Sequence, residues 1–196
     1  GLTGLVQGCN SEPTDVVLSL ERMNRIEEVD PVGRTMTVQA GVPLQLIQET
    51  AELSDLMFPL DLGARGSCQI GGNVSTNAGG NRVIRFGMAR ENVLGIEAVL
   101  ADGTVMSSLN VMIKNNSGYD LKQLFIGTEG TLGVITRIVL RLREIPQIQP
   151  TAFAAFDNFQ QVTKFLRFVD QRLGGELSAF EVMWHDSVSY THLRAH

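Results

Sequence analysis

Residues 71–80 form the strongest candidate for a ligand-binding segment. They read GGNVSTNAGG, with paired glycines at both ends and small polar side chains between them. Glycine lets the backbone approach a ligand closely, and successive backbone N–H groups can hold an anion such as a pyrophosphate. The alternative is a glycine-rich turn of an α+β domain, and composition alone does not separate the two. Neither the P-loop pattern GxxxxGK[ST] nor the dinucleotide fingerprint GxGxxG occurs in the chain.

Two further glycine-rich segments could belong to the same site. Residues 127–133 read GTEGTLG and lead directly into an apolar run, and residues 1–8 read GLTGLVQG. By itself, GTEGTLG would be a tight connection between a helix and a strand. Three such segments, with almost no catalytic side chains among them, favour a large cofactor that is held by backbone groups and carries the chemistry itself.

Four further side chains lie near these segments. Arg82, Arg85 and Arg90 could neutralise a pyrophosphate, although arginines on an exposed loop are more often solvated. Cys68 is expected to be a buried and unreactive thiol.

Length and composition limit the class of protein. The 196 residues, 43% hydrophobic and 19% charged, are enough for one globular domain or two small ones. The net charge of −5 argues against nucleic acid as a partner, and no apolar run reaches the roughly 20 residues of a membrane span. Cys9 and Cys68 make no metal-ligand pattern and suit a reducing compartment, the cytoplasm or the mitochondrial matrix of a eukaryote.

Hydrophobic periodicity predicts short elements that would position the glycine-rich segments. We expect strands over 16–20, 26–29, 35–40 and 132–142, helices over 43–54 and 120–125, and a hairpin over 93–108. Asp102-Gly103 suits the tight turn of that hairpin. In the strand over 132–142, apolar residues alternate with arginines, which indicates one face exposed to water.

The C-terminal part is predicted to be a separate piece. Pro146 and Pro150 bracket an expected linker. Beyond it we expect a strand over 151–156, a helix capped by Asn158 and ended by Gly174, and a strand over 176–184. This β-α-β piece is too small to stand alone and is typical of the beginning of a second domain.

Three long strings resemble the flavoprotein family of vanillyl-alcohol oxidase and p-cresol methylhydroxylase. They are FPLDLGARGSCQIGGNVSTNAGG, ENVLGIEAVLADGTV and GYDLKQLFIGTEGTLGVIT. Within the family they are most similar to the D-2-hydroxy-acid dehydrogenase branch, which includes D-2-hydroxyglutarate dehydrogenases and the FAD subunit of glycolate oxidase. The resemblance is dense over residues 1–145 and loose over 151–184.

The resemblance implies an α+β fold: the second subdomain of a PCMH-type FAD-binding domain, followed by the start of a ferredoxin-like substrate (cap) domain. The FAD-binding domain would take residues 1–145, without its N-terminal part, and the cap domain would begin over 151–186. The chain is therefore expected to be a fragment. Residues 187–196 are expected to be a non-native or disordered tail, because VSYTHLRAH does not continue the resemblance and looks like translated sequencing-adaptor DNA.

The resemblance also implies which residues hold the cofactor. Gln7 departs from the family pattern, which has a second glycine pair there. By their positions in the family motifs, the implied FAD-binding residues are Thr3, Gly4, Asp61, Ser67, Gly71, Gly72, Asn73, Thr76, Asn77, Ala78, Gly79, Glu129, Gly130, Gly133, Val134 and Ile135.

The implied function is FAD-dependent oxidation of a small D-2-hydroxy acid to the 2-oxo acid, with an electron acceptor that the sequence does not identify. FAD is expected to be non-covalent, because residues 1–184 contain no histidine for attachment. No catalytic or metal-ligating residue is assigned. In the branch, the base and a divalent metal belong to the C-terminal substrate domain beyond Asp186, so this chain alone is expected to be inactive. His192 and His196 have the i, i+4 spacing of two metal ligands, which is a weak signal.

Two alternatives remain open at this point. One is a flavin oxidase of an alcohol or phenol from the same family. The other is a non-catalytic domain that binds a dinucleotide or a peptidoglycan precursor, or a remnant without flavin.

Overall fold

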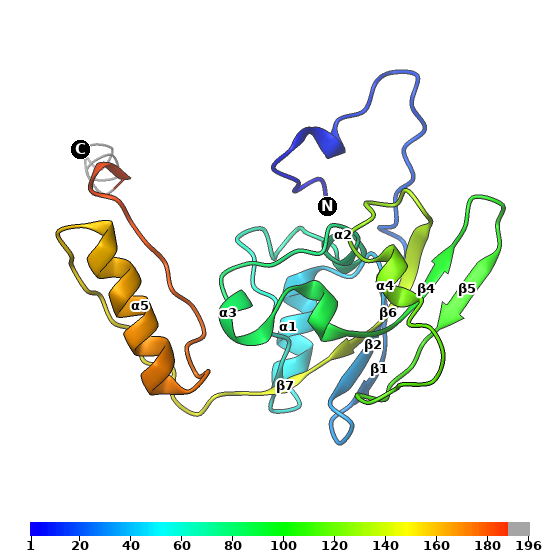
Figure 1. The fold of residues 1–196 in the computed structure, drawn as a ribbon. Coiled ribbons are helices and arrows are strands. Elements are labelled where there is room, and N and C mark those ends of the chain that lie inside the picture. The colour runs from blue at the N-terminus through cyan, green and yellow to red at the C-terminus, as the bar shows by residue number, and fades with distance from the viewer. Residues whose placement is uncertain (188–196) are drawn as a thin grey trace.

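A five-stranded antiparallel sheet is the centre of the computed structural model, which describes residues 1–187. Along the chain its strands are β1 (Ile26–Asp30), β2 (Thr35–Gln39), β4 (Val93–Val99), β5 (Val105–Ser108) and β6 (Val134–Arg141). In space the order is β1-β2-β6-β4-β5, so the last strand along the chain lies between the two hairpins (Figure 1). A second small sheet pairs β3 (Leu56–Met57) with β7 (Arg143–Glu144).

Both hairpins form where turn residues predict them. Asp30 Oδ1 accepts hydrogen bonds from the backbone N–H groups of Val32 and Gly33, which closes the turn between β1 and β2. Between β4 and β5, Gly103 adopts a φ of +84°, a left-handed conformation that favours glycine. The predictions of strands over 26–29 and 35–40 and of the second hairpin are confirmed.

One face of the sheet carries the apolar core. Met36 and Val38 of β2 and Ile138 and Leu140 of β6 are fully buried there. They share one apolar cluster with residues of α1 (Leu44–Glu52) and α2 (Ile70–Ser75). The helix expected over 43–54 is therefore confirmed as α1, with Pro43 at its N-cap. Burying each large apolar side chain stabilises the fold by about 1.5–3 kcal/mol.

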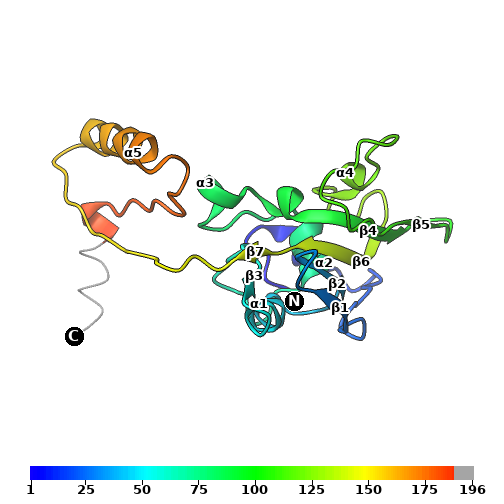
Figure 2. The same ribbon diagram turned by 90° about the horizontal axis from the view of Figure 1, so that it is seen from below.

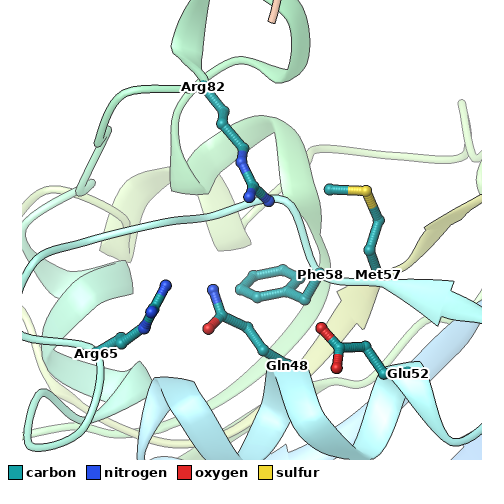
Figure 3. Close-up of a pocket in the computed structure, with 6 residues that line it drawn as sticks. All are labelled: Gln48, Glu52, Met57, Phe58, Arg65 and Arg82. Carbon is teal, nitrogen blue, oxygen red and sulfur yellow. The ribbon is translucent and has the colours of Figure 1, made fainter. Parts of the chain in front are cut away.

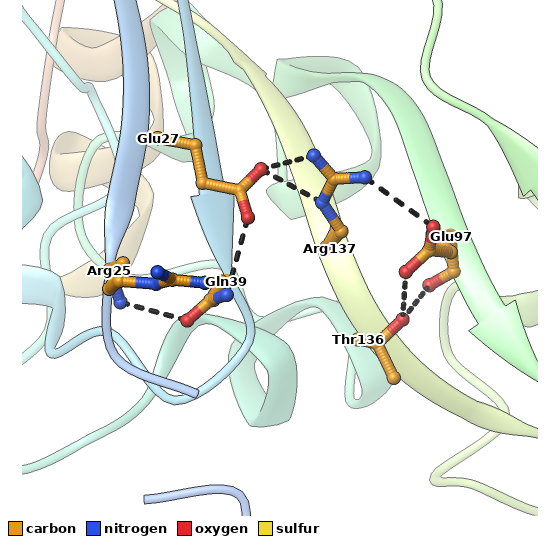
Figure 4. Close-up of polar contacts among 6 residues, drawn as sticks. All are labelled: Arg25, Glu27, Gln39, Glu97, Thr136 and Arg137. Carbon is orange, nitrogen blue, oxygen red and sulfur yellow. Dashed lines mark hydrogen bonds and ion pairs between the residues drawn. The ribbon is translucent and has the colours of Figure 1, made fainter. Parts of the chain in front are cut away.

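A ladder of polar groups crosses the other face of the sheet (Figure 4). Arg137 of β6 is ion-paired with Glu27 of β1 and with Glu97 of β4. The hydrogen bond to Glu27 is the main reason why the pKa of Arg137 is raised. The expected wet face of this strand is thus only partly right, because Arg137 is held between two carboxylates and Val139 beside it is buried.

The remaining helices are short, apart from one. The 3-10 helices are η1 (Gln7–Cys9) and η2 (Ala89–Asn92), and the α-helices are α3 (Val83–Phe86), α4 (Lys122–Phe125) and α5 (Phe159–Leu173). The short helix predicted over 120–125 is confirmed as α4. The strand predicted over 16–20 is wrong: this stretch is in no sheet, and Val16 is 97% exposed. No strand of the described sheets lies beside this stretch, so its backbone forms no strand pairing.

The C-terminal part contains the predicted helix but not the two predicted strands. As predicted, Asn158 caps α5 by accepting from Gln161 N, and Gly174 ends it with a φ of +56°. The strands predicted over 151–156 and 176–184 are wrong, because neither stretch is paired in a sheet. In two views α5 stands apart from the sheet, at the end of an extended segment (Figures 1 and 2). Arg85 of α3 reaches across to Glu176 through an ion pair.

Candidate functional site

Helix α2 starts against the end of β2, and Gly71 allows this close approach. Gly71 N donates to Ala40 O over 2.7 Å. A Cβ on Gly71 would lie only 2.6 Å from the Cβ of Ala40. The packing of α2 on the sheet is therefore sufficient to explain a glycine at this position, without a ligand.

Gly72 and Gly130 have the opposite surroundings. A Cβ at either position would meet no atom within 4 Å, and both residues are exposed. Gly130 also has a φ of +84°, which favours glycine. These two positions therefore present accessible backbone at the surface of the candidate site.

The three glycine-rich segments meet around α2. Gly127 N donates to Val74 O over 3.3 Å, and Glu129 N donates to Ser75 O over 2.9 Å. The opening segment lies against the same region. A Cβ on Gly8 would be 3.5 Å from Glu129 Oε2, and one on Gly1 would be 2.5 Å from Ser67 O. The fold thus brings together three segments that are far apart in the sequence.

Asn77 and Arg90 join two of these segments. Asn77 has a φ of +50°, and its Oδ1 accepts from Arg90 N over 3.0 Å. The Arg90 guanidinium donates to the backbone oxygens of Gln123, over 3.0 Å, and Ile126, over 2.6 Å. Its donors are therefore directed to protein carbonyls, which argues against the role in neutralising a pyrophosphate that the sequence suggested for Arg90. Sequence reasoning missed this bracing role, and no local signal points to it.

Asp61 lies between two arginines at the surface. Arg65 Nη1 is 3.3 Å from one of its carboxylate oxygens, and Arg82 Nη2 is 3.4 Å from the other. Next to them is a shallow hollow lined by Gln48, Glu52, Met57, Phe58, Arg65 and Arg82 (Figure 3). None of the residues that line this hollow belongs to the three glycine-rich segments. The hollow is therefore not part of the candidate site. Arg82 is engaged with Asp61 and Arg85 with Glu176.

Asn73 has an unusual environment within α2. Its side chain is buried, with the residue 7% exposed, and Asn73 Oδ1 has no hydrogen-bond partner within the part of the chain that the structure describes. A buried acceptor without a partner costs about 1–3 kcal/mol. The site therefore contains one polar atom that the protein alone leaves unsatisfied.

Cys68 is the buried thiol that the sequence predicts, at 1% exposure. Burial raises its pKa, and a side-chain hydrogen bond with Asn73 lowers the pKa by a smaller amount. Because the thiolate is the nucleophilic form, a raised pKa makes the thiol less reactive.

Two other candidate side chains donate hydrogen bonds to backbone oxygens nearby in the sequence. Thr76 Oγ1 donates to Gly72 O over 3.0 Å, and Ser67 Oγ donates to Ala64 O over 3.3 Å. Ala78 N donates to Asn73 O over 2.8 Å, which fixes the turn after α2.

Several candidates lie where packing explains them. A Cβ on Gly79 would be 2.9 Å from Val83. A Cβ on Gly133 would be 2.9 Å from the backbone oxygen of Val99. Gly4 is different, because it is exposed and a Cβ there would meet only Sγ of the exposed Cys9, at 2.8 Å.

Two candidates belong to the sheet, and one to the opening segment. Val134 and Ile135 begin β6 and pair with Val99 and Ala98 of β4. Thr3 is half-buried in the opening segment.

No metal site is evident among residues 1–187, where no group of three His, Cys, Asp or Glu side chains could hold an ion. His185 is exposed, and His192 and His196 lie outside the described residues. Within that same range, no helix is long and apolar enough to cross a membrane.

Comparisons with known proteins fit this geometry. Residues 1–108 match the family described as FAD binding domain. The chain is 47% identical over 183 residues to the mitochondrial D-2-hydroxyglutarate dehydrogenase of Danio rerio, covering 93% of this chain and 34% of that protein. It is 44% identical over 184 residues to the D-2-hydroxyglutarate dehydrogenase of Xanthomonas citri pv. viticola, covering 92% and 38%. The chain thus spans little more than a third of the length of these relatives.

A solved structure of alkyldihydroxyacetonephosphate synthase has the same fold, with a TM-score of 0.63 and a sequence identity of 21%. The match covers 78% of this chain and 27% of the synthase chain. The motif resemblance to an FAD-linked flavoprotein family is therefore confirmed, as is a mixed α+β fold for this region.

Proposed function

Since the chain belongs to the FAD binding domain family, we propose that it holds FAD as part of an oxidoreductase that converts a D-2-hydroxy acid into the 2-oxo acid. The observation that carries this proposal is the identity of 42–47% to proteins whose names all specify D-2-hydroxyglutarate, from fish, bacterium and yeast. D-2-hydroxyglutarate is therefore the substrate that we propose first. The electron acceptor stays unassigned.

The residues present fit FAD in two respects. Asn73 Oδ1 is a buried acceptor that needs a donor, and FAD carries hydroxyl and N–H donors. Gly72 and Gly130 leave open space where a side chain would stand, so a ligand can approach their backbone. We propose that the cofactor lies where the three glycine-rich segments meet, against the candidates that the family motifs imply.

Within this arrangement the chain binds and orients the cofactor. FAD, when bound, supplies the acceptor for the hydride that leaves the substrate carbon. Arg90 and Asn77 hold the two loops at a fixed separation, and Asp61 lies between two cations that restrict its carboxylate. We propose that attachment is non-covalent, because the Cys68 thiol is buried with a raised pKa and no histidine lies within residues 1–184.

The general base and the divalent metal are proposed to lie outside residues 1–187. Removing the hydroxyl proton needs a base within hydrogen-bond reach of the substrate, and a metal would lower the pKa of that hydroxyl. This placement rests on the resembling branch, whose substrate domain supplies both. The division into an FAD-binding domain over 1–145 and the start of a cap domain over 151–186 is part of the same proposal, and the separate position of α5 supports it.

A chimera tests the proposed function directly. Residues 1–187 of this chain would replace the matching segment of the Danio rerio relative, and dye reduction would be measured with D-2-hydroxyglutarate, D-malate and D-lactate. We expect turnover with D-2-hydroxyglutarate that a chelator abolishes, and no turnover by the 196-residue chain alone. A folded chimera without bound flavin would contradict the proposal, and peroxide formation from an alcohol or phenol would favour the oxidase alternative.

A further inference from the structure

One arginine side chain joins the C-terminal part, residues 151–187, to the sheet part, residues 1–144. Arg85 Nη1 donates to Glu176 O over 3.5 Å and to Ser178 Oγ over 3.4 Å, and Arg85 Nη2 is ion-paired with the Glu176 carboxylate. Within residues 1–186, every hydrogen bond and ion pair between the two parts involves Arg85. Their polar connection therefore depends on a single guanidinium.

The arginine is held firmly on its own side of this connection. It belongs to α3, which ends where Gly87 N donates to Val83 O over 2.9 Å. Asn92, which is 1% exposed, donates from Nδ2 to Phe86 O over 2.9 Å. The Arg85 guanidinium also lies over the Phe86 ring, 5.1 Å from its centroid, where a cation is attracted. The sheet part thus presents Arg85 from a fixed base.

The segments on either side of the C-terminal helix have few restraints of their own. Residues 145–158 form neither helix nor strand, and Ile148 is 80% exposed. After α5, Gly174 and Gly175 have φ values of +56° and +90°, and a Cβ on either would meet no atom within 4 Å. Glu176 follows directly. Because glycine backbone rotates with little steric hindrance, the contact of Glu176 with Arg85 restrains what these segments leave free.

Helix α3 also places Arg85 next to a glycine-rich segment. Gly80 ends the segment 71–80, and α3 begins three residues later at Val83. A Cβ on Gly79 would be 2.9 Å from Val83, so the first turn of α3 packs directly on that segment. In both views the chain that follows α5 returns to α3 (Figures 1 and 2). Arg85 therefore relates the C-terminal part to the loop that we propose to hold the cofactor.

We propose that Arg85 is a positioning residue, whose guanidinium binds Glu176 and Ser178 and so sets the orientation of the substrate domain relative to the cofactor. This inference rests on the proposed function and on its division into an FAD-binding domain and the start of a cap domain. Hydride transfer requires the substrate carbon and its acceptor in a fixed geometry. A clamp between the domains that hold them therefore acts on the chemical step and leaves cofactor binding unchanged.

The orientation can be measured in the FAD-free 196-residue protein as a distance between two spin labels. The labels would be attached through Val32→Cys and Lys164→Cys, at exposed positions of the two parts, in a Cys9→Ser background. We expect Arg85→Gln to raise the fraction of molecules outside the wild-type distance peak about threefold. Sodium chloride at about 1 M should have the same effect, because it screens the ion pair.

Two variants separate the clamp from a general loss of structure. Arg82→Gln is the matched control, since Arg82 pairs with Asp61 inside the sheet part, and it should keep the wild-type peak. The exchanged pair Arg85→Glu with Glu176→Arg should restore most of the peak that Arg85→Glu alone loses. An unchanged peak in Arg85→Gln, an equal change in Arg82→Gln, or no recovery in the exchanged pair would overturn the inference.

The chimera with the Danio rerio relative shows whether the clamp serves the reaction. We expect Arg85→Gln to keep the amount of bound FAD and to slow flavin reduction by D-2-hydroxyglutarate about tenfold. Loss of FAD from this variant, or an unchanged rate of reduction, would contradict the positioning role. A wild-type chimera that binds no flavin would instead overturn the proposed function, and the distance measurement does not depend on that outcome.

Discussion

The backbone N–H of Arg90 and the side-chain oxygen of Asn77 are joined by a hydrogen bond of 3.0 Å. Asn77 holds a left-handed conformation at the end of the segment GGNVSTN. The guanidinium of the same arginine extends to the carbonyl of Ile126, one residue before the second glycine-rich segment. A single residue thus connects the two loops through its backbone and its side chain together.

Replacing Arg90 should therefore loosen both loops. In Arg90→Met the carbonyls of Gln123 and Ile126 lose a charged donor, and we expect a loss of about 2–3 kcal/mol in the free energy of unfolding. Urea denaturation measures this loss. Arg167→Met, which removes an exposed arginine of α5, should change the stability by less than about 0.5 kcal/mol. Equal effects of the two variants would show that the bracing contacts contribute nothing.

The adjacent glycines of α2 should respond to alanine in opposite ways. Gly71→Ala places a methyl group 2.6 Å from the Cβ of Ala40, so it should destabilise the protein by about 1–3 kcal/mol. Gly72→Ala meets open space and should stabilise the FAD-free helix by about 0.5–1 kcal/mol. If the cofactor approaches the backbone at Gly72, the same substitution should weaken FAD binding. Thermal melts with and without FAD separate the two effects, and a stabilised Gly71→Ala variant would contradict the packing described for α2.

Alkaline pH should destabilise the fold through Cys68. Burial raises the pKa of this thiol above its ordinary value of 9.0, so the folded state retains a proton that the unfolded state releases. The stabilisation is complete below pH 9.0 and is lost as the pH rises from there towards the folded pKa. The slope is at most about 1.4 kcal/mol per pH unit.

Urea unfolding of wild type and Cys68→Ser between neutral and alkaline pH would measure this contribution as the difference between the two slopes. Cys9→Ser, which removes an exposed thiol, should keep the wild-type slope. Parallel profiles for wild type and Cys68→Ser would show that burial does not perturb the thiol.

Acid precipitation should release the flavin completely. Residues 1–184 contain no histidine that could form a covalent bond, and burial raises the pKa of the Cys68 thiol, which makes it less reactive. After precipitation of the flavin-loaded chimera, all yellow colour should therefore appear in the supernatant. Colour that remains in the pellet and follows a peptide from this segment would disprove non-covalent binding.

Elements with a local cause could be predicted from the sequence. Asp30 and Gly103 mark the two hairpin turns, and Asn158 and Gly174 mark the ends of α5; the structure confirms each of them. The strands expected over 16–20, 151–156 and 176–184 were wrong, because an apolar run does not specify whether a partner strand exists.

The candidate site also has some features that residue type predicts and others that it does not. Glycine content identified the three segments that meet at α2, since backbone access depends on residue type. The contacts of Arg90 could not be predicted, because it bonds residues 13 and 36 positions away.

The central place of β6 also determines when this sheet can assemble during translation. In the sheet of the described residues, the hairpins β1-β2 and β4-β5 are joined by hydrogen bonds through β6, which is the last of the five strands to be synthesised. Until the ribosome releases residues 134–141, β2 and β4 each present an unpaired edge on the nascent chain. Chaperones that mask strand edges would therefore have most to protect in the interval between the synthesis of β5 and that of β6.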